Sequence, residues 1–428
     1  MSSGSKPKPR SLRIRSYQVG FGDCFLLSFR YSNFSRHVLI DFGSMARPIG
    51  APTMEAIAEK IRVDCDGKLD AVVATHRHRD HISGFATRRD GKGTGNIIAS
   101  CKPNVVVQPW TENPCLPRDS PGPIASSSMR LRAFIASRAA MQEFAAATLE
   151  FIARQPFVGL RQRRMLQFLG ENNLSNYSAV ENLMQMGKRN SYCFYGSKSG
   201  LESRLPGVSV HVLGPPTLRQ SDAIRHQQAM SPSEYWHMRA QGLYLGTSRA
   251  RNARVDIFPR ARTFSSFPIP SRWLVDRLQK QQTDEIFELV RILDDHMNNT
   301  SLILLFRVGS TGILFPGDAQ FENWSYALSQ PKARQILSKV QVYKVGHHGS
   351  LNGTPKSLWK LFEGRSRRRE PGRIVSLNST MAEIHGSRVN NTEVPRRTLV
   401  KALTQETTYL TTQELRRGKT YLDYELNF

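Results

Sequence analysis

The chain has 428 residues, of which 39% are hydrophobic and 22% are charged, a composition typical of a globular protein that can bury a large core. No segment has the roughly 18 uninterrupted apolar residues that a membrane span needs. The five cysteines never stand in CxxC spacing, which argues against a cysteine metal site or a disulfide framework. The formal net charge of +25 makes nucleic acid or another phosphate-rich molecule a natural partner, although a general solubility effect is the plain alternative. The scattered cysteines favour the reducing cytoplasm.

The elements expected along the chain are those of a layered α/β domain. Residues 1–10 are basic and polar and should form a disordered tail, and the strand pattern begins at Ser11. Gly20 and Gly22 do not indicate a dinucleotide-binding loop, because a strand follows them and not a helix. The chain should end in a hairpin around Gly418. Strands are expected at residues 12–17, 24–29, 37–44, 69–74, 104–110, 208–213, 301–307, 312–315, 342–345 and 373–377, and helices at residues 51–63, 321–328 and 394–403.

Two long stretches depart from this pattern. Residues 123–190 are rich in alanine with helical spacing, and residues 217–296 are polar, rich in arginine and partly helical. Because the strand pattern resumes after each stretch, we interpret both as insertions into a single domain that spans residues 11–428. The second insertion suits a lid over a site, a wall for nucleic acid or a surface for a protein partner.

The segment after the expected strand at residues 69–74 concentrates side chains that bind metals. Within six positions it carries His76, His78, Asp80 and His81. Residues two apart on an extended segment share a face, so His76 and His78 can point at one place, which the other two approach from the following turn. Imidazole nitrogens and carboxylate oxygens are ligands of zinc and similar divalent ions. The alternative is a polar strand end that binds no metal, but this does not explain why four such side chains stand close together.

Two later strands also end in residues of this kind. Asp318 follows the strand at residues 312–315, and the pair His347 and His348 follows the strand at residues 342–345. Taken alone, Asp318 is as well explained as a turn-capping residue. Three strands that end in such residues together predict a metal site along one edge of a sheet.

In their order and their places at strand ends, these residues resemble the metallo-β-lactamase superfamily. The matching positions are Asp41, His76-x-His78-x-Asp80-His81, Asp318 and Gly346-His347. Four further segments are similar to the hydrolase domain of bacterial competence DNA-uptake channel proteins, namely residues 19–23, 298–302, 315–318 and 344–350. The resemblance covers residues 11–108 and 208–428. It implies an αββα sandwich with a dinuclear metal centre between its sheets.

The resemblance also implies how the ligands are divided between two ions. The ligands are His76 and His78 for the first ion, Asp80, His81 and His347 for the second, and Asp318 as the bridge between them. His348 is the alternative to His347. The superfamily usually has a third histidine on the first ion, but here the corresponding loop, residues 108–113, contains none. Either Glu112 substitutes for it or the first ion binds weakly, and His211, alone in an apolar strand, is expected to be a core residue.

Supporting roles follow from the same resemblance. Asp41 would orient a ligand histidine. Asp80 and His348 would act in catalysis, with Ser350 also near the substrate. His385 falls where the uptake-channel proteins have a His-Pro-Ser motif, and it would contact a substrate phosphate. The expected cofactor is zinc, as one or two ions, with manganese as the alternative metal.

The expected chemistry is hydrolysis, because two divalent ions about 4 Å apart lower the pKa of a water between them and hold the group under attack. Together with the positive charge, this favours a metal-dependent phosphodiesterase or nuclease. A fold does not name a substrate. The alternatives are a small-molecule ester, lactone or cyclic-nucleotide hydrolase whose insertions form a lid, and a degenerate domain that serves as a binding partner without catalysis.

Overall fold

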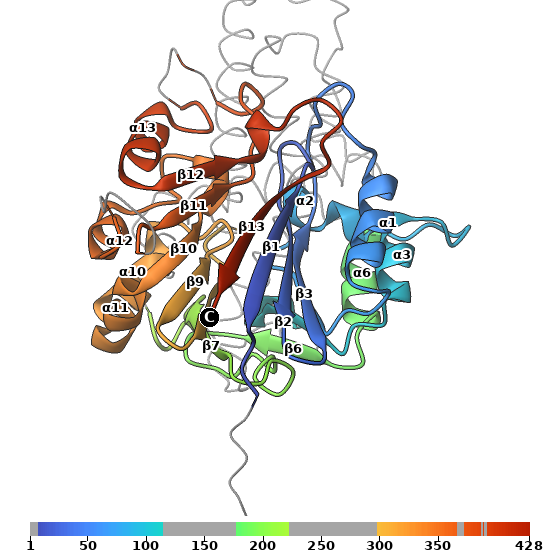
Figure 1. The fold of residues 1–428 in the computed structure, drawn as a ribbon, viewed down its shortest axis with the longest axis horizontal. Coiled ribbons are helices and arrows are strands. Elements are labelled where there is room, and N and C mark those ends of the chain that lie inside the picture. Colours follow the sequence, from blue (N-terminus) through green and yellow to red (C-terminus); the bar gives the residue numbers. More distant parts are fainter. Residues whose placement is uncertain (1–6, 114–176, 222–297, 366–371, 387, 389–391) are drawn as a thin grey trace, which may run out of the picture.

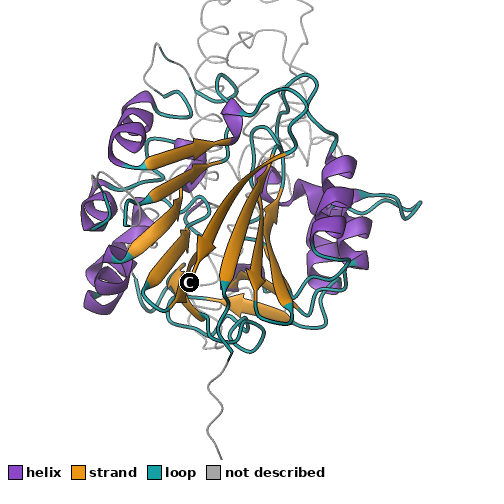
Figure 2. Ribbon diagram, in the orientation of Figure 1, coloured by secondary structure: helices purple, strands orange, loops and turns teal. Residues whose placement is uncertain are grey.

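The computed structural model describes residues 7–113, 177–221, 298–365, 372–386, 388 and 392–428. In this part of the chain two β-sheets pack face to face, and helices cover the outer side of each sheet (Figures 1 and 2). The expected layered α/β class is therefore confirmed. The expected insertions, residues 123–190 and 217–296, fall mainly outside the described residues. No described helix is long and apolar enough to cross a membrane.

The first sheet combines an antiparallel half with a parallel half. Its described strands follow the order β13-β1-β2-β3-β4-β5-β6. Neighbours are antiparallel from β13 to β3 and parallel from β3 to β6. The carboxyl ends of β3, β4 and β5 consequently meet at one edge. The strands are β1 (Ser11–Tyr17), β2 (Cys24–Arg30), β3 (Ser35–Phe42), β4 (Ala71–Val73), β5 (Val105–Pro109), β6 (Asn190–Cys193) and β13 (Tyr421–Asn427).

The second sheet repeats this plan in the order β12-β11-β10-β9-β8-β7. Neighbours are antiparallel from β7 to β9 and parallel from β9 to β12. The carboxyl ends of β9, β10 and β11 therefore also meet at one edge. The strands are β7 (Ser209–Gly214), β8 (Ile303–Val308), β9 (Thr311–Phe315), β10 (Val340–Lys344), β11 (Val375–Asn378) and β12 (Thr408–Thr411).

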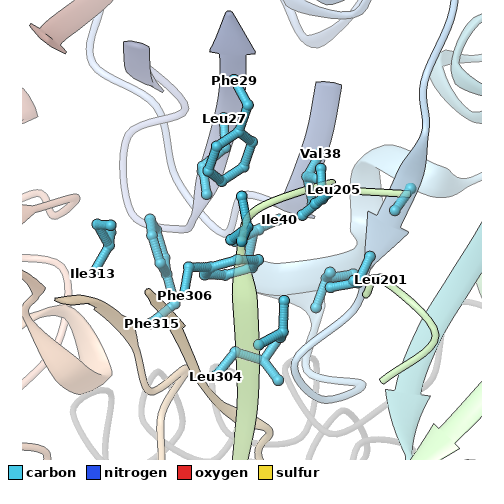
Figure 3. Close-up of a cluster of buried hydrophobic side chains, with 14 of the residues drawn as sticks. Leu27, Phe29, Val38, Ile40, Leu201, Leu205, Leu304, Phe306, Ile313 and Phe315 are labelled. Carbon is cyan, nitrogen blue, oxygen red and sulfur yellow. The ribbon is translucent and has the colours of Figure 1, made fainter. Parts of the chain in front are cut away.

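Apolar side chains fill the space between the sheets and the space beneath the helices on each side. Between the sheets, Phe29 on β2 meets Phe306 on β8 with ring centroids 6.1 Å apart (Figure 3). The helices on the first sheet are α1 (Met54–Asp64), α3 (Thr94–Ser100) and α6 (Tyr177–Gln185), and those on the second are α10 (Phe321–Ser329), α11 (Pro331–Ser338), α12 (Lys356–Leu361) and α13 (Arg397–Glu406).

Helix α1 illustrates how its sequence attaches an outer helix to a sheet. The hydroxyl of Thr53 accepts a hydrogen bond from the backbone N–H of Ala56 at 3.1 Å and so caps the first turn. Ile57, Ala58 and Ile61 recur at helical spacing and are buried against the first sheet. The amphipathic pattern read from the sequence therefore predicts both the helix and its buried face.

The prediction of a hairpin around Gly418 is wrong. The strands on either side of Gly418 lie in different sheets, because β12 pairs with β11 and β13 pairs with β1. The turn itself is present, and Gly418 has a φ of +85° that favours glycine. The strands nevertheless pair with the open edges of two different sheets and not with each other, which the local pattern does not reveal.

The expected borders of the N-terminal tail and of the first insertion also differ from those in the structure. The backbone N–H of Arg10 donates to the carbonyl of Arg30 at 2.7 Å, and its own carbonyl accepts from Phe428 at 2.9 Å, so the strand pairing includes the end of the expected tail. Residues 1–6 of that tail lie outside the described residues. Helix α6, which falls in the range expected for the first insertion, packs into the helical layer through Ala179 and Leu183.

A network of ion pairs ties the last strand to the first helix. Arg15 on β1 donates to both carboxylate oxygens of Asp423 on β13, at 2.7 and 2.6 Å, and pairs with Asp64 at the end of α1 at 2.6 Å. The hydroxyl of Tyr17 donates to Asp64 at 2.7 Å. The side chain of Asp64 is 7% exposed and that of Asp423 is 36% exposed.

We expect these two carboxylates to differ in what they contribute to stability. Asp64→Ala leaves Arg15 and Tyr17 without their buried partner and should lower the free energy of unfolding by about 3 kcal/mol. Asp423→Ala removes a better solvated partner of the same arginine and should cost about 1 kcal/mol or less. Urea unfolding followed by circular dichroism measures both losses. Equal losses would contradict the dependence on burial.

Candidate metal centre

Strands of both sheets deliver polar side chains to one end of the molecule. Asp41 lies near the end of β3, and residues 74–78 lead from β4 into the short helix α2 (Arg79–Ile82). On the second sheet, Asp318 follows β9 and the turn at residues 346–349 follows β10. Each candidate ligand thus stands just beyond the carboxyl end of a strand, the usual place for binding sites in α/β sheets.

Two glycines allow the loops around the site to approach one another. A Cβ atom on Gly43 would lie 2.3 Å from the backbone nitrogen of His81, and one on Gly22 would lie 2.3 Å from the carbonyl oxygen of Gly43. Only glycine permits backbone contacts this close. The backbone N–H of Asp23 also donates to the carbonyl of Asp80 at 2.9 Å, which fastens the turn before β2 to α2.

His76, His78 and Asp80 form a first group of buried donors whose ligand atoms all lie within 4.8 Å of one another. Nε2 of His76 is 3.0 Å from Nδ1 of His78. Two nitrogens bound to one tetrahedral zinc ion at about 2.0–2.1 Å are separated by about 3.3 Å. The two rings are therefore already close to the spacing that a shared ion requires.

His81, Asp318 and His348 form the centre of a second buried group. Oδ2 of Asp318 lies 3.1 Å from Nε2 of His81 and 3.4 Å from Nε2 of His348. Asp80 lies between the two groups, because its Oδ2 is 3.0 Å from Nε2 of His348 and its Oδ1 is 3.9 Å from Nε2 of His81. The residues brought together are those that the sequence singled out at three strand ends.

Hydrogen bonds on the far side of each ring fix the orientation of these histidines. Nδ1 of His81 is 2.8 Å from Oδ2 of Asp41, which also accepts from the hydroxyl of Thr75 at 2.7 Å. Nδ1 of His348 is 3.1 Å from the carbonyl oxygen of Ser379. Donation from Nδ1 leaves Nε2 of each ring directed at the carboxylates. Asp41 thus makes the contact expected of a residue that orients a histidine.

The two adjacent histidines after β10 are placed differently from the expectation that His347 is the ligand. His348 is fully buried and faces Asp80 and Asp318, whereas the side chain of His347 is 20% exposed and its Nε2 is 3.8 Å from Oδ2 of Asp318. Both histidines have left-handed backbone conformations, with φ of 49° and 51°. Such a conformation is strained for these residues, and strand alternation does not predict which ring it turns inward.

The surroundings of the buried histidines shift their pKa values in opposite directions. Burial works against a proton on His348, but the carboxylates of Asp318 and Asp23 outweigh it and raise the pKa of His348 to about 10. The pKa of His81 is likewise raised, against its burial, by Asp318 and Asp41. Burial and the neighbouring His81 lower the pKa of His76 well below its usual value. Two imidazolium groups therefore face carboxylates in the second group, while His76 is neutral.

Unsatisfied polar atoms mark the place where a cation fits. Among the described residues, Oδ1 of Asp80, Nε2 of His81 and Oδ1 of Asp318 are buried and make no hydrogen bond of acceptable geometry. Buried polar atoms of this kind cost free energy unless another group offsets it. A divalent cation would take up these lone pairs once the rings are deprotonated, and imidazoles with carboxylates are a donor set that such ions use. The two groups can therefore hold metal ions.

Glu112, considered as a replacement for the missing third histidine, pairs with an arginine and is not among the grouped ligand atoms of the described residues. Nε of Arg77 donates to a carboxylate oxygen of Glu112 at 2.6 Å. His211, expected to be a core residue, lies half-buried on β7, and burial together with Arg307 lowers its pKa. The first group accordingly contains two histidines and one carboxylate.

The residues expected near the substrate lie around His348. The ring of Phe21 lies near the rings of both His348 and His385, with centroid distances of 4.8 and 6.4 Å. Ser350 is buried, and its hydroxyl donates to Asn352 at 2.8 Å. His385 is half-buried in the loop that follows β11. Phe21, Ser350 and His385 belong to neither of the two groups of ligand atoms among the described residues.

Asp23 and Lys344 were not anticipated as parts of the site. Both are buried and their side chains form an ion pair, and Asp23 lies close enough to His81, Asp318 and His348 to count with them in the second group. In the sequence, Asp23 fits an ordinary turn after Gly22. Lys344 carries the stronger signal, because it interrupts a run of apolar residues at the end of an interior strand, where a charge requires a buried partner.

Comparison of the chain with models of protein families gives no match, and no curated protein matches it.

We expect the affinity for a metal ion to increase with pH between 6.5 and about 10. The raised pKa of His348 keeps its proton in the metal-free protein across this window, and a metal ion must displace that proton. Each pH unit should therefore strengthen binding by up to about tenfold per proton displaced. Competition with a metal-buffering chelator at several pH values measures the slope. An affinity that does not change across the window would contradict a protonated His348.

Proposed function

We propose that this protein is a metal-dependent hydrolase of the metallo-β-lactamase superfamily that uses zinc to cleave phosphodiester bonds, with nucleic acid as the proposed substrate. The observation that carries the proposal is the meeting of two buried groups of histidine and aspartate at the carboxyl ends of strands from two facing sheets. The αββα layering and the order of these residues along the chain agree with the superfamily resemblance.

The ligands that we assign follow from which atoms face one another. His76 and His78 would bind the first ion, and His81 and His348 would bind the second through Nε2. Asp80 groups with His76 and His78 and lies 3.0 Å from Nε2 of His348, so it would bind at either ion, and Asp318, near Nε2 of His81 and of His348, would bind the second. His348 replaces His347 in this assignment, because its buried Nε2 lies nearer to both carboxylates.

Bound divalent ions of this kind make a nucleophile from water near neutral pH and neutralise charge on the group that is attacked. The residues of the chain supply position and charge. Asp41 and the carbonyl of Ser379 hold two histidines by Nδ1, so that Nε2 is presented in a fixed direction. His347, half-buried beside Asp318, stands at the accessible side of the site and could donate a proton to a leaving group.

A phosphodiester substrate is supported by the charge of the protein. The net charge is +25, and two loops close to the site carry exposed basic residues. The loop after β3 carries Arg47 and makes backbone hydrogen bonds with Phe21, which lies beside His348. The loop before β13 carries Arg416 and Arg417, and the side chain of Arg417 lies next to Gly50 of the first loop. Polyanions bind such surfaces through their phosphates.

We expect substitution of the ligands to separate metal content from hydrolysis. His76→Ala together with His78→Ala should remove at least one equivalent of metal, because the first group then keeps a single donor. Asp80→Ala and Asp318→Asn should each lower hydrolysis at least about 1,000-fold, because these carboxylates lie between the rings. Metal content is measured by atomic emission, and hydrolysis on single- and double-stranded DNA, RNA and an activated phosphodiester.

The matched control is His211→Ala, a half-buried histidine on β7 outside both groups, which should leave metal content and hydrolysis unchanged. Unchanged metal content in the double histidine variant would refute the metal assignment. A metal-loaded protein that cleaves a carboxylic ester or lactone but no phosphodiester would refute the proposed substrate and keep the hydrolase.

We expect charge reversal near the site to reduce the salt dependence of binding. Arg416→Glu with Arg417→Glu should weaken oligonucleotide binding and flatten its dependence on salt, since each lost phosphate contact lowers the slope by about one unit. The control is Lys332→Glu with Arg334→Glu on α11, which precedes β10 and therefore lies at the opposite end of that strand. Fluorescence anisotropy in EDTA measures both. Equal effects of the two pairs would exclude a binding surface at these loops.

A further inference from the structure

Lys344 is a fully buried lysine beside the second group of ligands. It ends β10, and its ammonium group pairs with Oδ2 of Asp23. The same Nζ lies 3.6 Å from Oδ1 of Asp318 and donates to the carbonyl of Gly317 at 3.4 Å. Lysine is almost never buried to this degree without a specific partner. Two carboxylates and one carbonyl surround this one.

The two oxygens of Asp318 face different neighbours. Oδ2 points to Nε2 of His81 and of His348, at 3.1 and 3.4 Å. Oδ1 points to the ammonium of Lys344 and makes no hydrogen bond of acceptable geometry. The attraction of Oδ1 to the ammonium therefore fixes which oxygen of Asp318 is offered to a cation.

Asp23 lies on the Nδ1 side of the rings of His81 and His348, whereas Asp318 lies on their Nε2 side. Its Oδ1 is 3.5 Å from Nδ1 of His348 and its Oδ2 is 3.7 Å from Nδ1 of His81, whereas the candidate metal-binding atoms of these rings are Nε2. Although Asp23 is close enough to count among four possible ligands by distance alone, its direction argues against ligation. Its contact with Lys344 assigns it the role of holding the ammonium in place.

We propose that Lys344, anchored by Asp23, is a positioning residue of the metal centre that retains Oδ1 of Asp318 and leaves Oδ2 alone for the ions. This inference rests on the proposed metal site. The positive charge is needed as well as the hydrogen bond, because a neutral side chain here would leave Asp23 as an uncompensated buried carboxylate. Without the ammonium, Asp318 can turn both oxygens toward one ion and occupy a coordination position that hydrolysis needs open.

The test compares four full-length variants loaded with cobalt(II), whose visible absorption reports coordination number. They are Lys344→Met, Lys344→Arg, Asp23→Asn and the double variant Asp23→Asn with Lys344→Met. The double variant removes the ammonium without leaving an unpaired carboxylate, so it carries the test if Lys344→Met does not fold. Circular dichroism and metal content are measured for each variant.

We expect Lys344→Met and the double variant to bind the same number of cobalt ions as the unmodified chain. Their visible band should weaken by about a factor of two or more as the coordination number rises. Hydrolysis should fall about 10- to 100-fold through kcat, with KM little changed. Lys344→Arg keeps the charge and should restore most of the band, whereas a purely structural loss would alter stability without changing the cobalt spectrum.

A folded double variant with the cobalt spectrum and kcat of the unmodified chain would overturn the positioning role and leave the proposed hydrolase intact. An unmodified chain that binds no cobalt or zinc would overturn the proposed metal centre itself and this inference with it. The two failures are therefore distinguished by the unmodified protein.

Discussion

Four aspartates buried at one end of the molecule set the conditions that the rest of the structure must meet. Asp23, Asp41, Asp80 and Asp318 are each 3% exposed or less. Buried carboxylates that lack compensating charge are strongly unfavourable. Here Lys344 supplies positive charge in the metal-free state, and so do His81 and His348, whose raised pKa values favour the protonated rings. Divalent ions would take over that function when the histidines give up their protons.

The facing sheets make this concentration of charge possible. Parallel strands end together, so β3 and β4 of one sheet and β9 and β10 of the other deliver their polar side chains to one place. The apolar contacts between the sheets, which include Phe25 against Phe315 at a centroid distance of 5.4 Å, hold the two edges together. The polar site thus rests on an interface between the sheets that is built mainly from apolar side chains.

The sequence predicts this site best where chemistry and strand pattern coincide. The four ligand-type residues from His76 to His81 follow a buried strand, and Asp318 and the later histidines follow two others, so the edge of the sheets was predictable. The choice between His347 and His348 was not, because it depends on two left-handed residues in succession. The role of Asp23 was also missed, since its partner Lys344 lies more than 300 residues away and no local pattern joins them. The final hairpin failed for a related reason, because sheet edges and not the turn decide how β12 and β13 pair.

The separation of β12 and β13 has a consequence for the order in which the domain assembles during synthesis. β1 leaves the ribosome before every other described strand, yet its partner β13 leaves after all of them. Until then β1 presents an unpaired edge, the kind of surface that other chains join by strand addition. Contacts between such distant segments also form slowly. The nascent chain therefore carries an open strand edge at β1 for as long as β13 has yet to be made.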